Sequence, residues 1–304
     1  MRVLIALDAT PSCAKIIEEA VNRPWPSGST FLLLHVLDPF PFVKAPISLQ
    51  RAKDAAHAEL KNLKECLVDA GWKTETDVVL GHPRSAIGES ATSWKADLLM
   101  LGSNDLGPVA RLLLGSTAHS ILRRAPCSVE IVRPSANGKR PRAAGMKILV
   151  ATDGSEYSVT ALRSVASRPW PKDSEVKVLS VPEPFLPINV FPYFESKEIE
   201  NLNTSALEEA NRAVDTGVKL LSKLDAKVST QTPFPQASPA RVIVKEAQEW
   251  GAQMIVLGSH GRRGFDRLTM GSVSEYVAFH GHCSVEVIRS RKVQKKRSRK
   301  GGSQ

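Results

Sequence analysis

The chain has 304 residues, of which 42% are hydrophobic and 24% charged, and its formal net charge is +10. This length provides for about two domains of ordinary size, and the composition is that of a globular protein. No apolar run approaches the roughly 20 residues that a membrane-spanning helix needs. The opening MRVLIALDAT predicts a first strand rather than a secretion signal, so we expect a cytoplasmic protein.

Most of the positive charge lies at the C-terminal end. Between Arg289 and Lys300 there are eight basic residues and no acidic one, so the rest of the chain accounts for only +2 of the +10. Residues 290–304 therefore predict a disordered basic tail. Such a tail contacts nucleic acid, other polyanions or anionic membranes without sequence preference, or it serves only to keep the protein soluble.

The sequence repeats itself. The opening decapeptide returns as MKILVATDGS at Met146, and the tetrapeptide RPWP at Arg23 returns at Arg168, both 145 residues later. Later matches, such as Trp94 with Trp250, are 156 residues apart, so the second copy has 11 extra residues, which we place in the stretch 184–196. We predict two domains at 1–133 and 146–289, joined by a linker at 134–145 that is rich in helix-breaking residues.

Each copy alternates apolar runs with amphipathic segments. In the first copy the runs predict strands at 3–7, 31–37, 98–101 and 128–132, and the end of another strand at 77–80. Helical periodicity predicts helices at 11–22, 48–70, 84–95 and 116–124. The second copy follows the same plan, with its long helix at about 197–224. This alternation predicts an α/β fold in which each copy is an open, doubly wound parallel sheet.

The most informative stretch follows the fourth predicted strand of the second copy. The apolar run 254–257 ends in Gly258-Ser259-His260-Gly261, a basic loop follows, and Gly271-Ser272 stands at the predicted start of a helix. Glycines let the backbone approach a ligand closely. Successive N–H groups form an anion-binding nest, and a helix start adds free donors and a positive dipole end.

A carboxylate is expected beside this loop. Ligands of doubly wound sheets collect where the strand order reverses, at the carboxyl ends of the strands. If the first and fourth strands of a copy are neighbours there, Asp153 in the second copy and Asp8 in the first lie next to the glycine loops. An aspartate that accepts from ribose hydroxyls or an adenine amine, together with glycine turns for phosphates, predicts a nucleotide site.

Each of these features also has a plainer interpretation. The glycines fit two ordinary turns, and Asp153 fits the cap of the next helix. Arg262, Arg263 and Arg267 fit a solvated basic loop, with His260 as one of its solvated side chains.

The duplication, the strand-end aspartate and the glycine spacing together resemble the universal stress protein family. The motif is G-x-x-G, nine residues, then G-(S/T), and the second copy has it in full at Gly258, Gly261 and Gly271-Ser272. The resemblance covers 1–133 and 146–289. It implies tandem five-stranded parallel sheets of order 3-2-1-4-5 and binding of ATP or another adenine nucleotide, with Mg²⁺ where the phosphates carry it. By position, it implies a nucleotide site made of Thr152, Asp153, Val181, Gly258, His260, Gly261, Arg262, Gly271, Ser272, Val273 and Ser274.

The first copy departs from this motif. Gly102 and Gly115-Ser116 are present at the right spacing, but Asp105 replaces the second glycine. A carboxylate in a phosphate nest repels the ligand and restricts the backbone. We therefore expect nucleotide in the second copy first. Because Asp8 is retained, a weaker site, or one that takes adenosine alone, is the alternative for the first copy, around Asp8, Val36, Gly102, Gly115 and Ser116.

The sequence favours a nucleotide-binding regulatory protein of the stress response over an enzyme. It lacks the GxxxxGK(S/T) phosphate loop and the GxSxG nucleophile elbow. We expect at most slow ATP hydrolysis and name no catalytic or metal-binding residues. The competing hypothesis is a nucleotide-independent dimerising scaffold whose basic tail binds nucleic acid or other polyanions.

The last predicted strand of each copy bears on assembly. SVEIVR and SVEVIR, which begin at Ser128 and Ser284, alternate in the way that suits an edge strand. The resemblance implies that such edges pair between domains of the family. We therefore expect an intramolecular pseudo-dimer of the two copies and a homodimer of the chain.

Overall fold

The same five-stranded arrangement occurs twice along the chain. The computed structural model describes residues 1–8, 10, 12–43, 46–103, 114–133, 145–183, 195–233, 238–262 and 270–289. Within these residues the chain divides into two units, of which the second is Ala144–Ile288. The predicted insertion at 184–196, the linker and the basic tail lie wholly or mostly outside the described residues.

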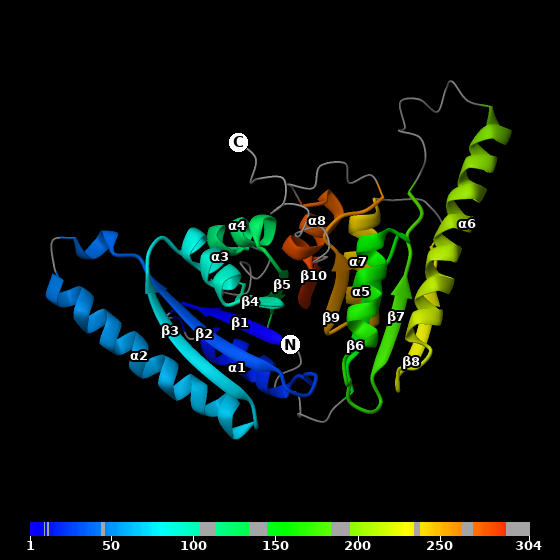
Figure 1. The fold of residues 1–304 in the computed structure, drawn as a ribbon. Coiled ribbons are helices and arrows are strands. Elements are labelled where there is room, and N and C mark those ends of the chain that lie inside the picture. The colour runs from blue at the N-terminus through cyan, green and yellow to red at the C-terminus, as the bar shows by residue number, and fades with distance from the viewer. Residues whose placement is uncertain are drawn as a thin grey trace, which may run out of the picture. The chain divides into compact units, whose positions relative to one another are not determined.

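The N-terminal unit is a parallel sheet with helices on both faces. Its strands run in the order β3-β2-β1-β4-β5, and all neighbouring pairs are parallel. The elements are β1 (Arg2–Leu7), α1 (Ser12–Asn22), β2 (Thr30–Leu37), the 3-10 helix η1 (Phe40–Phe42), α2 (Pro46–Asp69), β3 (Lys73–Leu80), α3 (Pro83–Ser93), β4 (Leu98–Gly102), α4 (Ser116–Arg124) and β5 (Ser128–Val132) (Figure 1).

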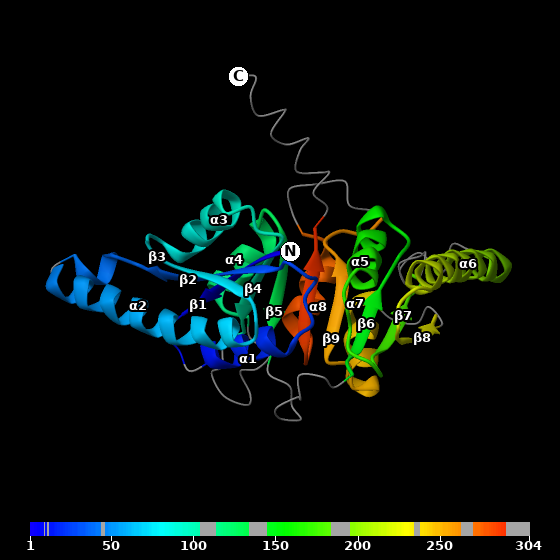
Figure 2. The same ribbon diagram turned by 60° about the horizontal axis from the view of Figure 1, so that its bottom comes forward.

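The C-terminal unit has the same topology. Its strand order is β8-β7-β6-β9-β10, again with parallel neighbours. Both units therefore have the predicted order 3-2-1-4-5, and the predicted α/β fold is confirmed. The elements are β6 (Lys147–Ala151), α5 (Glu156–Ala166), β7 (Glu175–Leu179), α6 (Ser196–Leu221), β8 (Lys227–Gln231), α7 (Pro239–Trp250), β9 (Met254–Gly258), α8 (Ser272–His280) and β10 (Ser284–Ile288) (Figure 2).

Helices cover both faces of each sheet because the inner strands are apolar on both sides. α1 packs beside α2 and α3 beside α4, and in the second unit α5 packs beside α6 and α7 beside α8. The inner strands β4 and β9 read LLMLG and MIVLG, and their first four residues are all buried. Such continuous apolar runs are typical of parallel strands buried on both faces. None of the described helices is long and apolar enough to cross a membrane.

The boundaries of the outer elements differ from the sequence prediction. β3 begins at Lys73, so the predicted stretch 77–80 is only its second half. The first half, KTET, alternates exposed and buried residues because β3 lies at the end of its sheet, where the apolar signal is weakest. Similarly, α6 ends at Leu221, three residues before the predicted end.

In each unit a buried ion pair joins the repeated RPWP motif to the repeated last strand. In the N-terminal unit the guanidinium of Arg23, from the first RPWP motif, pairs with Glu130 of β5, and both side chains are fully buried. In the C-terminal unit Arg168 makes two hydrogen bonds to Glu286 of β10, one of them 2.7 Å long. Each pair ties the residues that follow a unit's first helix to its last strand.

The buried guanidinium of Arg23 stays charged because two carboxylates lie beside it. Burial alone would lower the pKa of Arg23, but the carboxylates of Glu130 and Glu19 more than offset it and raise the pKa above its ordinary value. The motif's tryptophan is also held, since the indole nitrogens of Trp25 and Trp170 donate to Ala20 and Val165 carbonyls at 2.7 and 2.8 Å. The repeated RPWP sequence is therefore a structural anchor.

Replacing Glu130 by Leu is expected to lower the free energy of unfolding by about 3–5 kcal/mol, because the buried Arg23 loses its main carboxylate. The double variant Arg23→Met/Glu130→Leu should recover much of that loss, since it removes both fully buried charges and leaves only the partly exposed Glu19. Urea denaturation followed by tryptophan fluorescence measures both.

The exposed pair Lys245–Glu249 supplies the control. Glu249→Gln should change the free energy of unfolding by less than about 0.5 kcal/mol, because exposed helix pairs contribute little. A Glu130→Leu variant as stable as the wild type would contradict the anchoring role.

Candidate functional site

In the C-terminal unit the ends of β6 and β9 bring two separate segments together. Gly258, the last residue of β9, lies so close to the start of α5 that a Cβ there would be 2.6 Å from the carbonyl carbon of Tyr157 and 2.8 Å from the nitrogen of Ser158. Real Cβ atoms do not approach a backbone this closely, so only glycine fits. The motif's first glycine thus sets the close approach of the β9 loop to the turn that contains Asp153.

Asp153 is the centre of this contact. Its Oδ1 accepts from the backbone nitrogen of Ser155 at 3.0 Å, and its Oδ2 accepts from that of Arg262 at 2.9 Å. Gly261 fits against the same carboxylate, because a Cβ there would lie 2.8 Å from Oδ2. The N-cap of α5 is Ser155, whose side chain accepts from the nitrogen of Ser158, so the plainer interpretation of Asp153 as the helix cap is wrong. Asp153 instead holds the turn before α5 and the loop after β9.

Arg262 extends this contact to α6. Its Nε donates to the backbone carbonyl of Asp153 at 2.6 Å, and its guanidinium forms an ion pair with Glu209. Both side chains of the pair remain half-exposed. Of the three arginines predicted in this loop, Arg263 and Arg267 lie outside the described residues. A single described arginine thus links the strand-end aspartate with the long helix.

The second glycine turn is built from hydrogen bonds between the β9 loop and α8. The nitrogen of Gly271 donates to the carbonyl of Ser259 at 2.9 Å. The hydroxyl of Ser274 lies 3.0 Å from that carbonyl and 3.0 Å from the carbonyl of Gly271. Ser272 and Val273 begin α8 directly after this turn, so their N–H groups belong to the helix's first turn, the part of a helix that binds anions.

His260 differs from its prediction. It was expected in a solvated loop, but only 8% of it is exposed. Its Nδ1 lies 3.0 Å from the hydroxyl of Ser259, and its ring packs 4.9 Å from that of Tyr157. The expectation of a solvated histidine is therefore wrong, because the close approach at Gly258 covers the residue.

The other predicted residues of the C-terminal unit lie at the ends of β6 and β7. Thr152 is buried, its backbone nitrogen donates to Leu179 at 2.9 Å, and its hydroxyl lies 3.1 Å from that of Ser158. It positions the turn that carries Asp153. Val181 is half-buried and follows β7 by two residues. Its backbone is thus at the same edge of the sheet.

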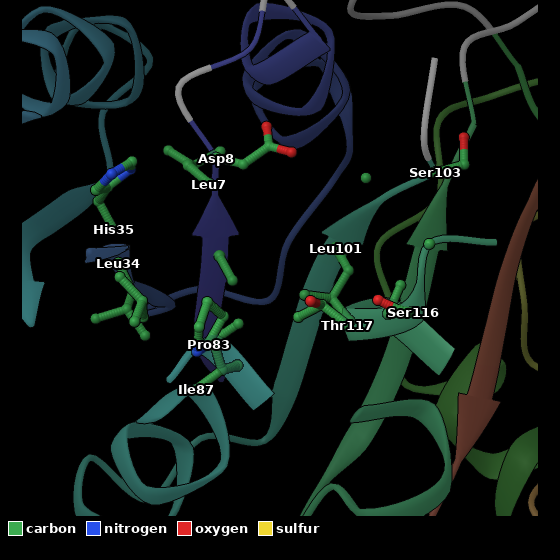
Figure 3. Close-up of a pocket in the computed structure, with 15 residues that line it drawn as sticks. Leu7, Asp8, Leu34, His35, Pro83, Ile87, Leu101, Ser103, Ser116 and Thr117 are labelled. Carbon is green, nitrogen blue, oxygen red and sulfur yellow. The ribbon is translucent and has the colours of Figure 1, made fainter. Parts of the chain in front are cut away.

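In the N-terminal unit a cavity of about 280 Å³ lies at the corresponding place. All five residues predicted for the first copy line it: Asp8, Val36, Gly102, Gly115 and Ser116. Side chains from β2, α3, β4 and α4 gather around the cavity (Figure 3). The structure therefore brings together a predicted set that comes from four separate segments.

Three polar lining residues were missed by the sequence reasoning: His35, Ser103 and Thr117. The internal repeat was the available signal. His35 precedes Val36 just as Ser180 precedes Val181, and Ser103 and Thr117 occupy the positions of Ser259 and Val273.

The surroundings of Asp8 differ from those of Asp153. Its carboxylate accepts from the hydroxyl of Thr10, and the thiol of Cys13 lies 3.5 Å from the same oxygen. Burial, with a smaller effect of Asp8, raises the pKa of Cys13 to about 11, so this thiol stays protonated at neutral pH. A Cβ on Gly102 would meet only the side chain of Ile16, at 2.9 Å. Asp105 lies outside the described residues.

The comparisons with known proteins agree with this architecture. The model of the universal stress protein family matches residues 1–133 and 146–289. The chain belongs to the universal stress protein family. A universal stress protein of Mycolicibacterium smegmatis is 24% identical over 306 residues, which cover 95% of this chain and 97% of that protein. Another, of Mycobacterium tuberculosis, is 26% identical over 238 residues, or 76% and 74% of the two chains.

A solved structure supports the fold of this stress protein. The crystal structure of a universal stress protein from Archaeoglobus fulgidus has a TM-score of 0.64, covering 95% of this chain and 96% of that one, at 17% identity. At this identity the likeness shows the fold alone. Among the described residues of the stress protein, no group of three or more His, Cys, Asp or Glu side chains could hold a metal ion.

The glycines at the ends of β4 and β9 provide a matched test. Gly258→Ala is expected to destabilise the stress protein by about 1–3 kcal/mol, because the added carbon meets backbone atoms that cannot move independently. Gly102→Ala should cost less, since Ile16 can change its rotamer. Thermal unfolding of the two variants measures the difference, and equal melting temperatures would contradict the close approach at Gly258.

Proposed function

We propose that this stress protein binds ATP or a related adenine nucleotide in its C-terminal unit and acts as a regulatory switch in the stress response. The observation that carries the proposal is the convergence of Asp153, the 258–262 loop and the first turn of α8 at the carboxyl ends of β6 and β9. A carboxylate for the ribose and two glycine turns for phosphates suit a nucleotide better than a bare anion.

Each part of the site has an expected role. Asp153 accepts hydrogen bonds from the ribose hydroxyls and adenine amine, and the backbone of Val181 contacts the adenine ring. Gly258, Gly261 and the segment from Gly271 to Ser274 surround the phosphates. Thr152 and His260 support the two turns by packing. Mg²⁺, when it accompanies the nucleotide, neutralises phosphate charge.

The glycine turns fit a phosphate group. A Cβ on Gly271 would lie 3.2 Å from the Ser259 carbonyl and 3.3 Å from the Cα of His260. The turn is therefore packed as tightly as a bare glycine allows on that side. A larger residue here requires the turn to shift, and with it the start of α8, where the free N–H donors are.

Arg262 gives the site a means of reporting whether ligand is bound. A ribose at Asp153 competes with the hydrogen bonds that Arg262 donates there, and a phosphate attracts the guanidinium away from Glu209. Nucleotide binding thereby changes a contact of α6. This change is the proposed link between ligand and partner binding.

No efficient catalysis is proposed. The hydroxyl of Ser259 lies 3.0 Å from Nδ1 of His260, but both residues are buried, so hydrolysis, where it occurs, should be slow. We also propose a cytoplasmic location and assembly through homodimers, as expected from the sequence. The nucleotide-independent scaffold is the competing function, and it predicts protein that binds no adenine nucleotide.

Gly271→Val is expected to weaken ATP binding at least tenfold, because the side chain meets the backbone of Ser259 and His260 and displaces the turn that presents the N–H donors of α8. The matched control is Gly115→Val at the equivalent position before α4, which should leave the affinity of the C-terminal site unchanged. Isothermal titration calorimetry measures both, with circular dichroism as a check on folding. Unchanged ATP binding in Gly271→Val overturns the assignment, and no ATP binding to the wild type favours the scaffold.

Glu209→Gln is expected to tighten ATP binding about 1.5- to 5-fold. The variant frees Arg262 from an exposed ion pair, whose contribution is typically about 0.2–1 kcal/mol. Arg262→Ala also removes that competing contact, but it loses the phosphate partner as well. It should therefore bind ATP more weakly than Glu209→Gln does. A weaker ATP affinity in Glu209→Gln would contradict the competition between ligand and α6.

A further inference from the structure

We propose that the cavity of the N-terminal unit is a second ligand site, and that it takes an uncharged nucleoside rather than a nucleotide. The inference rests on the proposed function, because it assigns the strand-end aspartate the same ribose-binding role in both units. It goes beyond that function in giving the two units different ligands. Four observations on the lining residues carry it.

The first observation is charge. Among the described residues that line the cavity, Asp8 is the only one with a formal charge, and no lysine or arginine is present. A polyphosphate placed there meets a like charge without compensation. By sequence, residues 103–114 carry one acid and one base, whereas residues 259–270 carry three arginines and one acid, a net +2. The described lining residues of the N-terminal cavity thus offer no positive side chain to a phosphate chain.

The second observation is the start of the helix. The C-terminal unit uses the hydroxyl of Ser274 to brace its glycine turn, and the equivalent residue of α4 is Ala118. At the preceding position the N-terminal unit has the hydroxyl instead: Thr117, which lines the cavity, corresponds to Val273 of the C-terminal unit. The N-terminal unit thus lacks the hydroxyl that braces the glycine turn of the C-terminal unit. It has instead a threonine that lines the cavity, and such a residue suits a neutral polar ligand.

The third observation is a buried imidazole. His35 is 7% exposed, lines the cavity and has no side-chain hydrogen bond to any of the described residues. A neutral imidazole offers one donor and one acceptor, which is the pairing that a base edge or a sugar hydroxyl can use. Because His35 lines the cavity, a ligand bound there can pair with it. The equivalent residue in the other unit is Ser180.

The fourth observation is size. The cavity, at about 280 Å³, is just below the roughly 300–1,000 Å³ that small-molecule pockets occupy, which favours a small ligand. Its apolar wall comes from Leu34, Ile87 and Leu101, each at most 5% exposed. In Figure 3 Asp8 and His35 lie at the strand ends, away from Ile87 on α3. A flat base against the apolar wall and a ribose toward Asp8 match this distribution.

The test uses the full chain with its C-terminal site disabled by Asp153→Asn/Gly271→Val. Calorimetry on this variant should show adenosine binding, with ATP at least tenfold weaker. Adding Asp8→Asn should weaken adenosine about fivefold or more and reduce the discrimination against ATP, because it removes the like charge. Adding His35→Ser should weaken adenosine about threefold or more.

If the disabled variant does not fold, a second measurement on the wild-type chain tests the same inference. Adenosine is titrated into the wild-type chain while its histidine side-chain NMR signals are recorded, and the signal that His35→Ser lacks should shift. ATP at the same concentration should leave that signal unchanged.

The inference is overturned if ATP binds the disabled variant as tightly as adenosine, or if adenosine neither binds nor shifts the His35 signal. Failure of the proposed function looks different, since it appears as ATP binding in the wild type that Gly271→Val does not reduce.

Discussion

The close approach of two backbones at Gly258 is the constraint on which the site depends. Because this glycine lies against Tyr157 and Ser158, the loop after β9 comes within hydrogen-bonding distance of the turn after β6. A side chain at this position would hold the two segments apart, and Asp153 would then lose its contact with Arg262. The same approach covers His260 and brings its ring against Tyr157. The packing at Gly258 is thus what allows the hydrogen bonds of Asp153 and Arg262 that shape the candidate nucleotide site.

The two units of this stress protein share their scaffold and differ at the ligand edge. Each has a buried arginine–glutamate pair and a tryptophan held by a backbone carbonyl, and these contacts join the residues after the first helix to the last strand. The differences lie where the strands end. A duplicated domain can keep its anchors and change its ligand preference in this way, because the core and the strand ends make separate contacts.

The contact between Arg262 and Glu209 gives the C-terminal unit a route from ligand to surface. α6 extends over 26 residues, and the ion pair at Glu209 remains half-exposed. Exposed pairs contribute little free energy, so a ligand can displace this one without a large conformational cost. A change at α6 would then accompany binding while the sheet stays fixed. In the proposed function, partners recognise that change.

Much of this protein could be read from sequence, and the limits have a physical cause. The apolar runs, the 145-residue repeat and the glycine spacing determined the strands, the duplication and the family resemblance, because burial and turns leave a local pattern. The local pattern was weakest at β3, because exposed and buried residues alternate in the first half of this outer strand. Only the tertiary structure decided that His260 is buried, that His35 lines the cavity and that Arg262 reaches both Asp153 and Glu209. Those contacts join residues up to 109 positions apart, and no periodicity along a chain records which distant side chains meet when its sheets and helices pack.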